Sequence, residues 1–149
     1  MVCALLTGLA PSLTEPLTVG YVASLATKLS DTFGSEIGKA YGKTAYLITT
    51  LKQVPRGTEG AVSVEGTLAG VVGSLLLVAV ARLLGVLPAT PIAAIACIAA
   101  AFVATTAESF IGAVWQAPGK LPWLSNELVN LANTVIGAAV AVAIFGLAA

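Results

Sequence analysis

The apolar positions of the chain fall into long runs, separated by short stretches in which polar residues gather. A membrane-spanning helix needs about twenty largely apolar residues. Residues 66–87, residues 91–114 and residues 127–149 meet this requirement, and the last of these runs carries no charge after Glu127. The pattern therefore predicts three spanning helices.

A fourth, weaker candidate covers residues 16–33. It is apolar over residues 17–25 but then contains Lys28 and Asp31. We predict an entering helix whose polar end faces protein or water. The stretch between this helix and residue 66 is longer than an ordinary connection, which indicates a functional loop.

Composition agrees with a membrane protein, because 58% of the residues are apolar and 9% are charged. These values lie outside the usual range of soluble domains. We predict an all-α integral membrane protein with three to four transmembrane helices and a polar, glycine-rich loop at one membrane face. We expect residues 1–149 to form a single membrane domain, and the start, with a short apolar run and no basic segment, looks like the middle of a longer protein.

Charge and histidine content narrow the function. The net charge is zero and the positive residues are few and clustered, so nucleic acid is not an expected partner. The chain has no histidine, which leaves acid and base chemistry to carboxylates and lysines.

Most of the charge lies between residues 31 and 65, interleaved with glycine. Charged groups beside a membrane usually mark a functional site. If this stretch is cytoplasmic or stromal, most lysines and arginines lie on that side. The polar residues Glu108, Gln116, Asn126 and Asn130 then fall at the same ends of their helices, so the polar groups converge on one membrane face.

The segment DTFGSEIGKAYGK, residues 31–43, combines carboxylates, glycines and lysines. Asp31 and Glu36 are the predicted Mg²⁺ ligands, since that ion is held by one or two carboxylates. Lys39 and Lys43, four residues apart on one helical face, would neutralise phosphate. The alternative is a solvated helix end with ion pairs such as Glu36 with Lys39. Glycines at 34, 38 and 42 favour the functional interpretation, because they make a poor ordinary helix.

The segment from residue 52 to residue 70 predicts a rigid turn at Pro55 and a glycine-rich loop that leads into a helix at about residue 66. Freed backbone N–H groups, hydroxyls and a helix N-terminus form an anion site. The spacing of a Walker A loop is absent. The alternative is a structural loop capped by Ser63. The candidate anion-binding residues are Arg56, Gly57, Thr58, Gly60 and Ser63.

Polar residues also occur within the later, mostly apolar helices. Glu108 stands in an otherwise uncharged helix and requires a cation or a partner. Asn126, Asn130 and Asn133 form one amide face, for which hydrogen bonding between helices is the alternative to ligand binding. The ridge of small residues at 66, 70 and 74 predicts helix packing.

Four segments together resemble a known family. Residues 31–43, 52–70, 108–116 and 126–130 are similar to the plastid and cyanobacterial phytyl-phosphate kinases of tocopherol and phylloquinone synthesis. That family is related to the transmembrane-protein-19 homologues, long catalogued as a domain of unknown function. Its members usually carry several more hydrophobic helices before the segment that begins here, so the resemblance covers their C-terminal part.

The resemblance implies a lipid phosphotransferase that uses Mg²⁺ and CTP, or another nucleoside triphosphate, to convert phytyl monophosphate into phytyl diphosphate. It implies Asp31, Glu36 and Glu108 as metal or catalytic residues. The implied nucleotide contacts are Lys39, Lys43, Lys52, Arg56, Gly57 and Thr58, with Glu65, Gln116, Asn126 and Asn130 as further site residues.

The expected partners are a prenyl phosphate and the lipid bilayer, and the oligomeric state is open, with a homo-oligomer as one option. A plastid envelope, thylakoid or cyanobacterial membrane follows from the resemblance. Two alternatives stay open: a non-enzymatic transporter or helper subunit, and a CTP-dependent lipid cytidylyltransferase.

Overall fold

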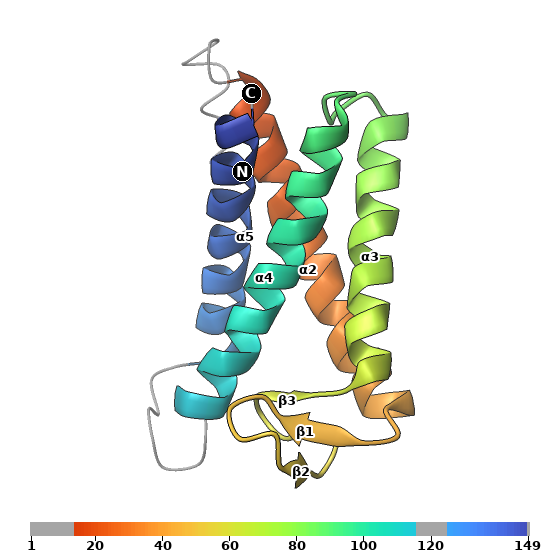
Figure 1. Cartoon of the computed structure of the whole chain (residues 1–149), viewed down its shortest axis with the longest axis vertical. Helices are drawn as coiled ribbons and strands as arrows, with labels where there is room; N and C mark the ends of the chain where they lie inside the picture. Colours follow the sequence, from red (N-terminus) through yellow and green to blue (C-terminus); the bar gives the residue numbers. More distant parts are fainter. Residues whose placement is uncertain (1–13, 116–124, 149) are drawn as a thin grey trace.

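A computed structural model describes residues 14–115 and 125–148 of the chain. These residues form four helices and three short strands (Figure 1). In chain order they are α2 (Thr14–Tyr41), β1 (Ala45–Leu47), β2 (Gln53–Val54), β3 (Ala61–Val62), α3 (Val64–Leu83), α4 (Pro91–Trp115) and α5 (Asn126–Ala148). Among the described residues, α3, α4 and α5 are long and apolar enough to cross a membrane. The predicted helical membrane fold is confirmed.

Helix α2 is longer than the sequence predicted. It continues without interruption to Tyr41 instead of ending near residue 33. The glycines at 34 and 38 therefore do not break the helix, and the interpretation that they disfavour an ordinary helix was wrong. We expected Lys39 and Lys43 to share one helical face. Lys43 lies beyond the end of α2, so they do not.

The connection between α2 and α3 contains a small antiparallel sheet in the order β2-β1-β3, which was not predicted. Tyr46 pairs with Gln53 on one side and with Val62 on the other. The Leu47 N–H donates to the Lys52 carbonyl oxygen at 2.9 Å and closes the first hairpin. The sheet lies across one end of the helix bundle (Figure 1).

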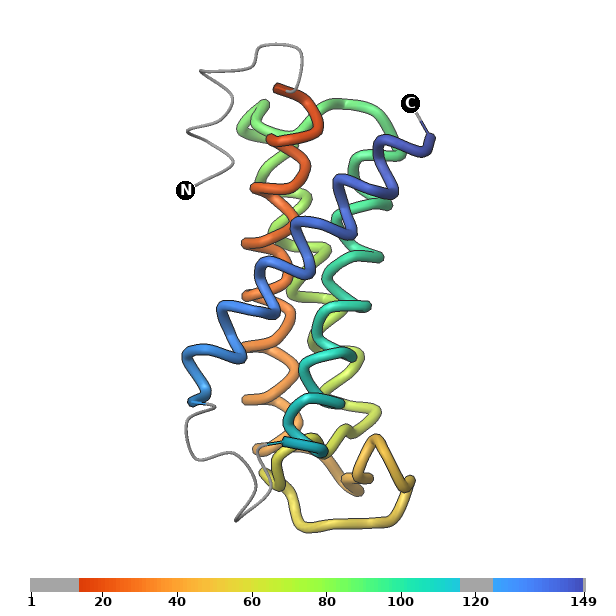
Figure 2. Tube along the Cα trace, turned by 90° about the vertical axis from the view of Figure 1, so that its left-hand side faces the viewer, coloured from red at the N-terminus to blue at the C-terminus, as the bar shows by residue number. Residues whose placement is uncertain are grey.

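Helix α2 contacts each of the other three helices. The chain runs toward the sheet in α2 and α4 and away from it in α3 and α5, and α5 crosses the bundle obliquely (Figure 2). Away from the sheet, small and branched apolar residues form a tightly packed core, which includes Val19, Val22, Ala93, Ala96, Ala100, Ala141 and Phe145. The polar ends of all four helices therefore meet at the sheet.

Close contact between α2 and α3 depends on glycine. A methyl group at Gly66 would lie 2.7 Å from the carbonyl oxygen of Gly34, and one at Gly70 would lie 3.0 Å from the hydroxyl oxygen of Ser30. Small residues let helix backbones approach in this way, which favours packing between membrane helices. The ridge predicted to pack against another helix is therefore confirmed, and its partner is α2.

We expect Gly66→Ala to lower the free energy of unfolding by about 1–3 kcal/mol, because the added methyl group has no room beside the α2 backbone. Gly146→Ala in α5 is the matched control, since nothing lies within 4 Å of a methyl group there. Unfolding by denaturing detergent, followed by circular dichroism, measures both. Equal stability of the two variants would contradict the close α2–α3 contact.

Candidate functional site

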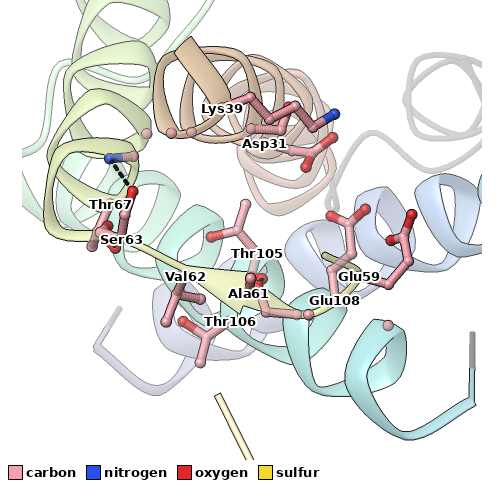
Figure 3. A pocket seen from close by; sticks show the side chains of 18 of the residues that line it. Asp31, Lys39, Glu59, Ala61, Val62, Ser63, Thr67, Thr105, Thr106 and Glu108 are labelled. Carbon is pink, nitrogen blue, oxygen red and sulfur yellow. Dashed lines mark hydrogen bonds between the residues drawn. The ribbon is translucent and has the colours of Figure 1, made fainter. Parts of the chain in front are cut away.

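A cavity of about 290 Å³ lies inside the sheet end of the bundle (Figure 3). All four helices and the segment between α2 and α3 contribute to its walls. The predicted site residues that line it are Asp31, Lys39, Arg56, Gly57, Thr58, Gly60, Ser63, Glu108, Asn126 and Asn130. The structure thus brings together residues that are up to about a hundred positions apart in the chain.

Four of the predicted residues that the structure describes are not part of this cavity wall. Glu36, Lys43, Lys52 and Glu65 do not line it. Gln116 lies outside the described residues. The charged stretch singled out in the sequence is therefore divided by the fold, with part of it facing the cavity and part of it facing away.

Asp31 and Glu108 form the centre of the charged wall. Their carboxyl groups lie within direct interaction range, and both point into the cavity (Figure 3). Asp31 also accepts a hydrogen bond from the Lys28 ammonium at 3.0 Å, and its side chain is only 19% exposed. Two carboxylates this close repel each other unless a cation or a proton lies between them.

Glu36 is placed differently from the prediction. Its side chain is 71% exposed and pairs with Lys39 at 3.8 Å, as the solvated alternative expected. Five helical positions separate Asp31 from Glu36, which puts them roughly 140° apart around α2. The structure therefore does not bring the predicted metal pair together, and it brings Asp31 to Glu108 instead.

Lys28 connects α2 to α5, although the sequence analysis did not place it in the site. Its ammonium group donates to the Asn130 side-chain oxygen at 2.6 Å as well as to Asp31. The signal in the sequence is a lysine three residues before an aspartate within a helix. Its second partner is 102 residues away in the chain, so local spacing could not have identified it.

Asn133 connects α5 to α4. Its side-chain amide donates to the Glu108 carboxylate, and the residue is 1% exposed. Among the described residues, its amide oxygen has no hydrogen-bond partner. The alternative interpretation of the amide face, hydrogen bonding between helices, is confirmed for Asn130 and Asn133.

The loop between β2 and β3 covers part of the cavity. Gly57 and Gly60 have φ values of 82° and 74°, which favour glycine, and Gly60 packs directly against Ala113 of α4. The Thr58 hydroxyl donates to the Pro55 carbonyl oxygen at 2.7 Å and closes the turn. Arg56 donates to the Ala40 carbonyl oxygen at 3.4 Å, which places its guanidinium group over the end of α2.

Ser63 is the N-cap of α3, because its side-chain oxygen accepts a hydrogen bond from the Gly66 N–H at 3.1 Å. This is the structural role given as the alternative for Ser63, and it is confirmed. The capped helix still directs its N-terminus toward the cavity, where Ser63 and Thr67 line the wall (Figure 3). A helix N-terminus favours negative charge nearby.

Several other residues of the cavity wall were not predicted. Glu59 adds a third carboxylate, and Thr105, Thr106 and Ser109 add hydroxyl groups on α4 (Figure 3). The hydroxyls of Thr105 and Thr106 donate to carbonyl oxygens of their own helix, at 2.9 and 2.7 Å. The signal was the polar run from residue 105 to residue 109 in an alanine-rich helix.

The donor groups present suit Mg²⁺ better than a metal that needs a full protein cage. Within residues 14–115 and 125–148, no group of three or more His, Cys, Asp or Glu side chains could hold a metal ion. Mg²⁺ is usually bound by one or two carboxylates and keeps water or phosphate oxygens in its remaining positions. Asp31 and Glu108 provide such a pair.

Comparison with known proteins identifies relatives of the whole chain. The family described as integral membrane protein DUF92 matches residues 1–138. The chain is 54% identical over 146 residues to an uncharacterized membrane protein of Synechocystis and 52% identical over 124 residues to the chloroplastic protein VTE6 of Arabidopsis thaliana. It is 39% identical over 128 residues to an uncharacterized membrane protein of Methanocaldococcus jannaschii.

These matches cover 95%, 83% and 85% of the chain, in the same order, but only 54%, 37% and 51% of the relatives. The chain thus spans about half the length, or less, of the curated relatives it matches. No solved structure matches it. The chloroplastic and cyanobacterial relatives fit a plastid or cyanobacterial membrane.

We expect Lys28→Met to lower the free energy of unfolding by about 1 kcal/mol, because it removes the side-chain hydrogen bond between Lys28 of α2 and Asn130 of α5. Lys43→Met is the matched control, since Lys43 is exposed and lies beyond the end of α2. Detergent unfolding measures the difference, and identical curves for the two variants would contradict the role given to Lys28.

Proposed function

The chain belongs to the DUF92 family of integral membrane proteins, and on this premise we propose that it acts in phosphoryl transfer to a prenyl phosphate at the membrane surface. The reaction is transfer of the γ-phosphoryl group of CTP, or of another nucleoside triphosphate, to phytyl monophosphate. The product is phytyl diphosphate, and the role is in tocopherol and phylloquinone synthesis. The observation that supports the proposal most is the cavity, which gathers Asp31, Glu108, Lys39 and Arg56 at one end of a membrane bundle.

The chemistry requires positioning more than a strong base. An oxygen of the lipid phosphate is already anionic at neutral pH, and it forms a bond to the γ-phosphorus. The bond from that phosphorus to the oxygen bridging the β-phosphate breaks, and the nucleoside diphosphate leaves with the electron pair. Aligning two polyanions and neutralising their charge supplies most of the catalysis in such reactions. A chain without histidine is therefore no obstacle.

Each wall of the cavity has a role in this scheme. Asp31 and Glu108 would hold Mg²⁺, which supplies the positive charge that phosphoryl transfer needs. Arg56 offers a planar fork that matches phosphate oxygens, and Lys39 adds a mobile positive charge. The N–H groups of the loop around Gly57 and the N-terminus of α3 favour an anion between them.

We expect Asp31→Asn and Glu108→Gln each to lower the rate of transfer by about 100-fold or more, since each removes a negatively charged ligand of the Mg²⁺ that would stabilise the transition state. Glu36→Gln is the matched control and is expected to retain activity, because Glu36 faces away from the cavity. Membranes carrying the chain are given phytyl phosphate, Mg²⁺ and CTP labelled at the γ-phosphate, and labelled phytyl diphosphate is measured.

Four outcomes of this assay separate the alternatives. Full activity of Asp31→Asn would contradict the assignment of Asp31 as a Mg²⁺ ligand. In a parallel assay with CTP labelled at the α-phosphate, label on the lipid and release of pyrophosphate would identify a cytidylyltransferase. No transfer from this chain, with transfer from the Synechocystis relative, would assign the requirement to the part of that relative not covered here. No transfer from either protein would favour a transporter or helper subunit.

We also expect chelation of divalent cations to abolish transfer and Mg²⁺ to restore it. Glu108→Gln should raise the Mg²⁺ concentration for half-maximal activity by about 10-fold or more, because it removes one of two charged ligands. A Mg²⁺ titration of the residual activity measures the shift, with Glu36→Gln again as the control. An unchanged titration in Glu108→Gln would contradict metal binding at Glu108.

A further inference from the structure

The cavity changes in chemical character from one side to the other. Where α2, α4 and α5 meet, its wall carries Asp31, Glu108 and Asn130. Where α3 faces α4, its wall carries Val71, Phe102, Thr105 and Thr106. The second side has no charge among these described residues. A cavity that is charged at one end and apolar at the other fits an amphiphile.

We infer that the hydrocarbon chain of a lipid phosphate enters this cavity sideways from the bilayer, through a portal between α3 and α4 bordered by Val71 and Phe102. This inference rests on the proposed function, because it assigns a binding route to the lipid substrate of the same site. It adds the entry path, the helices that form it and the residues that border it.

The arrangement of α3 and α4 forms the opening. The two helices are joined at the end of the bundle away from the sheet, where Val78 and Ala81 of α3 and Ala93 and Ala96 of α4 belong to one core. From there they separate toward the sheet (Figure 1). Strand β3 passes below the gap, and its neighbour Gly60 packs against Ala113 of α4. The cavity is thus bounded by protein at the sheet, and Val71 and Phe102 line it where α3 faces α4.

Exposure supports a lateral opening at this position. Phe102 lines the cavity and is still 49% exposed, and Thr67 on α3 also lines it while exposed. Val71 lies roughly two turns inside α3, which is a candidate membrane span. A side chain at this depth faces hydrocarbon instead of water. The medium that reaches the cavity between Val71 and Phe102 is therefore the bilayer.

The polar groups at the portal are already satisfied. The hydroxyls of Thr105 and Thr106 donate to backbone oxygens of α4, so an apolar chain that enters here leaves neither hydroxyl without a partner. The cavity is at the small end of the range of about 300–1,000 Å³ for ligand sites. It suits a phosphate headgroup and the first part of one chain, with the remainder in the bilayer.

The two substrates would thus approach from different sides. Arg56, Gly57 and Thr58 lie on the sheet side, which faces water, whereas Val71 and Phe102 lie on the bilayer side. The lipid phosphate and the nucleotide meet near Asp31 and Glu108. This separation explains why a charged site is placed inside one end of an apolar bundle.

Photochemical crosslinking tests the portal directly. The chain is reconstituted in liposomes with a geranylgeranyl phosphate that carries a diazirine on its first isoprene unit, and labelled peptides are mapped by mass spectrometry. We expect labelling at residues 67–71 and 102–106 that unlabelled geranylgeranyl phosphate suppresses. Suppressible labelling confined to α2 and α5, or labelling that competition does not reduce, would overturn the portal.

A pair of variants on the same helix tests the border residue. Phe102→Trp should lower the suppressible labelling by about 10-fold, because the larger ring narrows the opening. Phe110→Trp is the matched control, since Phe110 is also exposed on α4 but does not line the cavity. Circular dichroism confirms that both variants keep their helices. Equal labelling of the two variants would contradict the role of Phe102.

The result separates this inference from the proposed function. Portal labelling without phosphoryl transfer from either this chain or the Synechocystis relative would keep the lipid route and contradict the kinase. Phosphoryl transfer with suppressible labelling elsewhere would contradict only the portal. The longer Synechocystis relative provides the last comparison: absence of portal labelling there would show that its additional segment covers the α3–α4 opening, and the portal would be overturned.

Discussion

Close contact between the backbones of α2 and α3 is the constraint on which the rest of the structure depends. With Gly34 facing Gly66 and Ser30 facing Gly70, α3 is held against α2 along the half of the bundle nearest the sheet. Helix α4 shares one core with α3 near their connection, where small residues such as Ala93 and Ala96 are buried. Toward the sheet, all four helices and the segment between α2 and α3 enclose the cavity.

The second requirement is that polar groups inside an apolar bundle find partners. Lys28 bonds to Asp31 and Asn130, and Asn133 bonds to Glu108, so the hydrogen bonds that join α2, α4 and α5 are made to three residues that line the cavity. The hydrogen bonds that hold the helices together thus involve residues of the proposed site. A residue such as Glu108 therefore both joins two helices and lines the cavity.

The sequence predicted the three apolar helices well, because long apolar runs have a direct physical meaning in a membrane. It failed at the small sheet, since strands of two or three residues are too short to show a period. It paired Asp31 with Glu36 because they are neighbours in the chain, whereas the fold pairs Asp31 with Glu108. The glycines of α2 are evident in the sequence, but their local spacing does not reveal that α3 is the helix that packs against them.

The low apolarity of α2 has a consequence for how the protein is made. Within the described residues, only α3, α4 and α5 are apolar enough to enter a bilayer unaided. Yet α2 contacts all three of the other described helices. During synthesis α2 emerges before α5 can offer Asn130 to Lys28. The contacts of α2 with α3, α4 and α5 therefore form only after those helices have followed it, which makes the packing of α2 a cooperative event of the bundle.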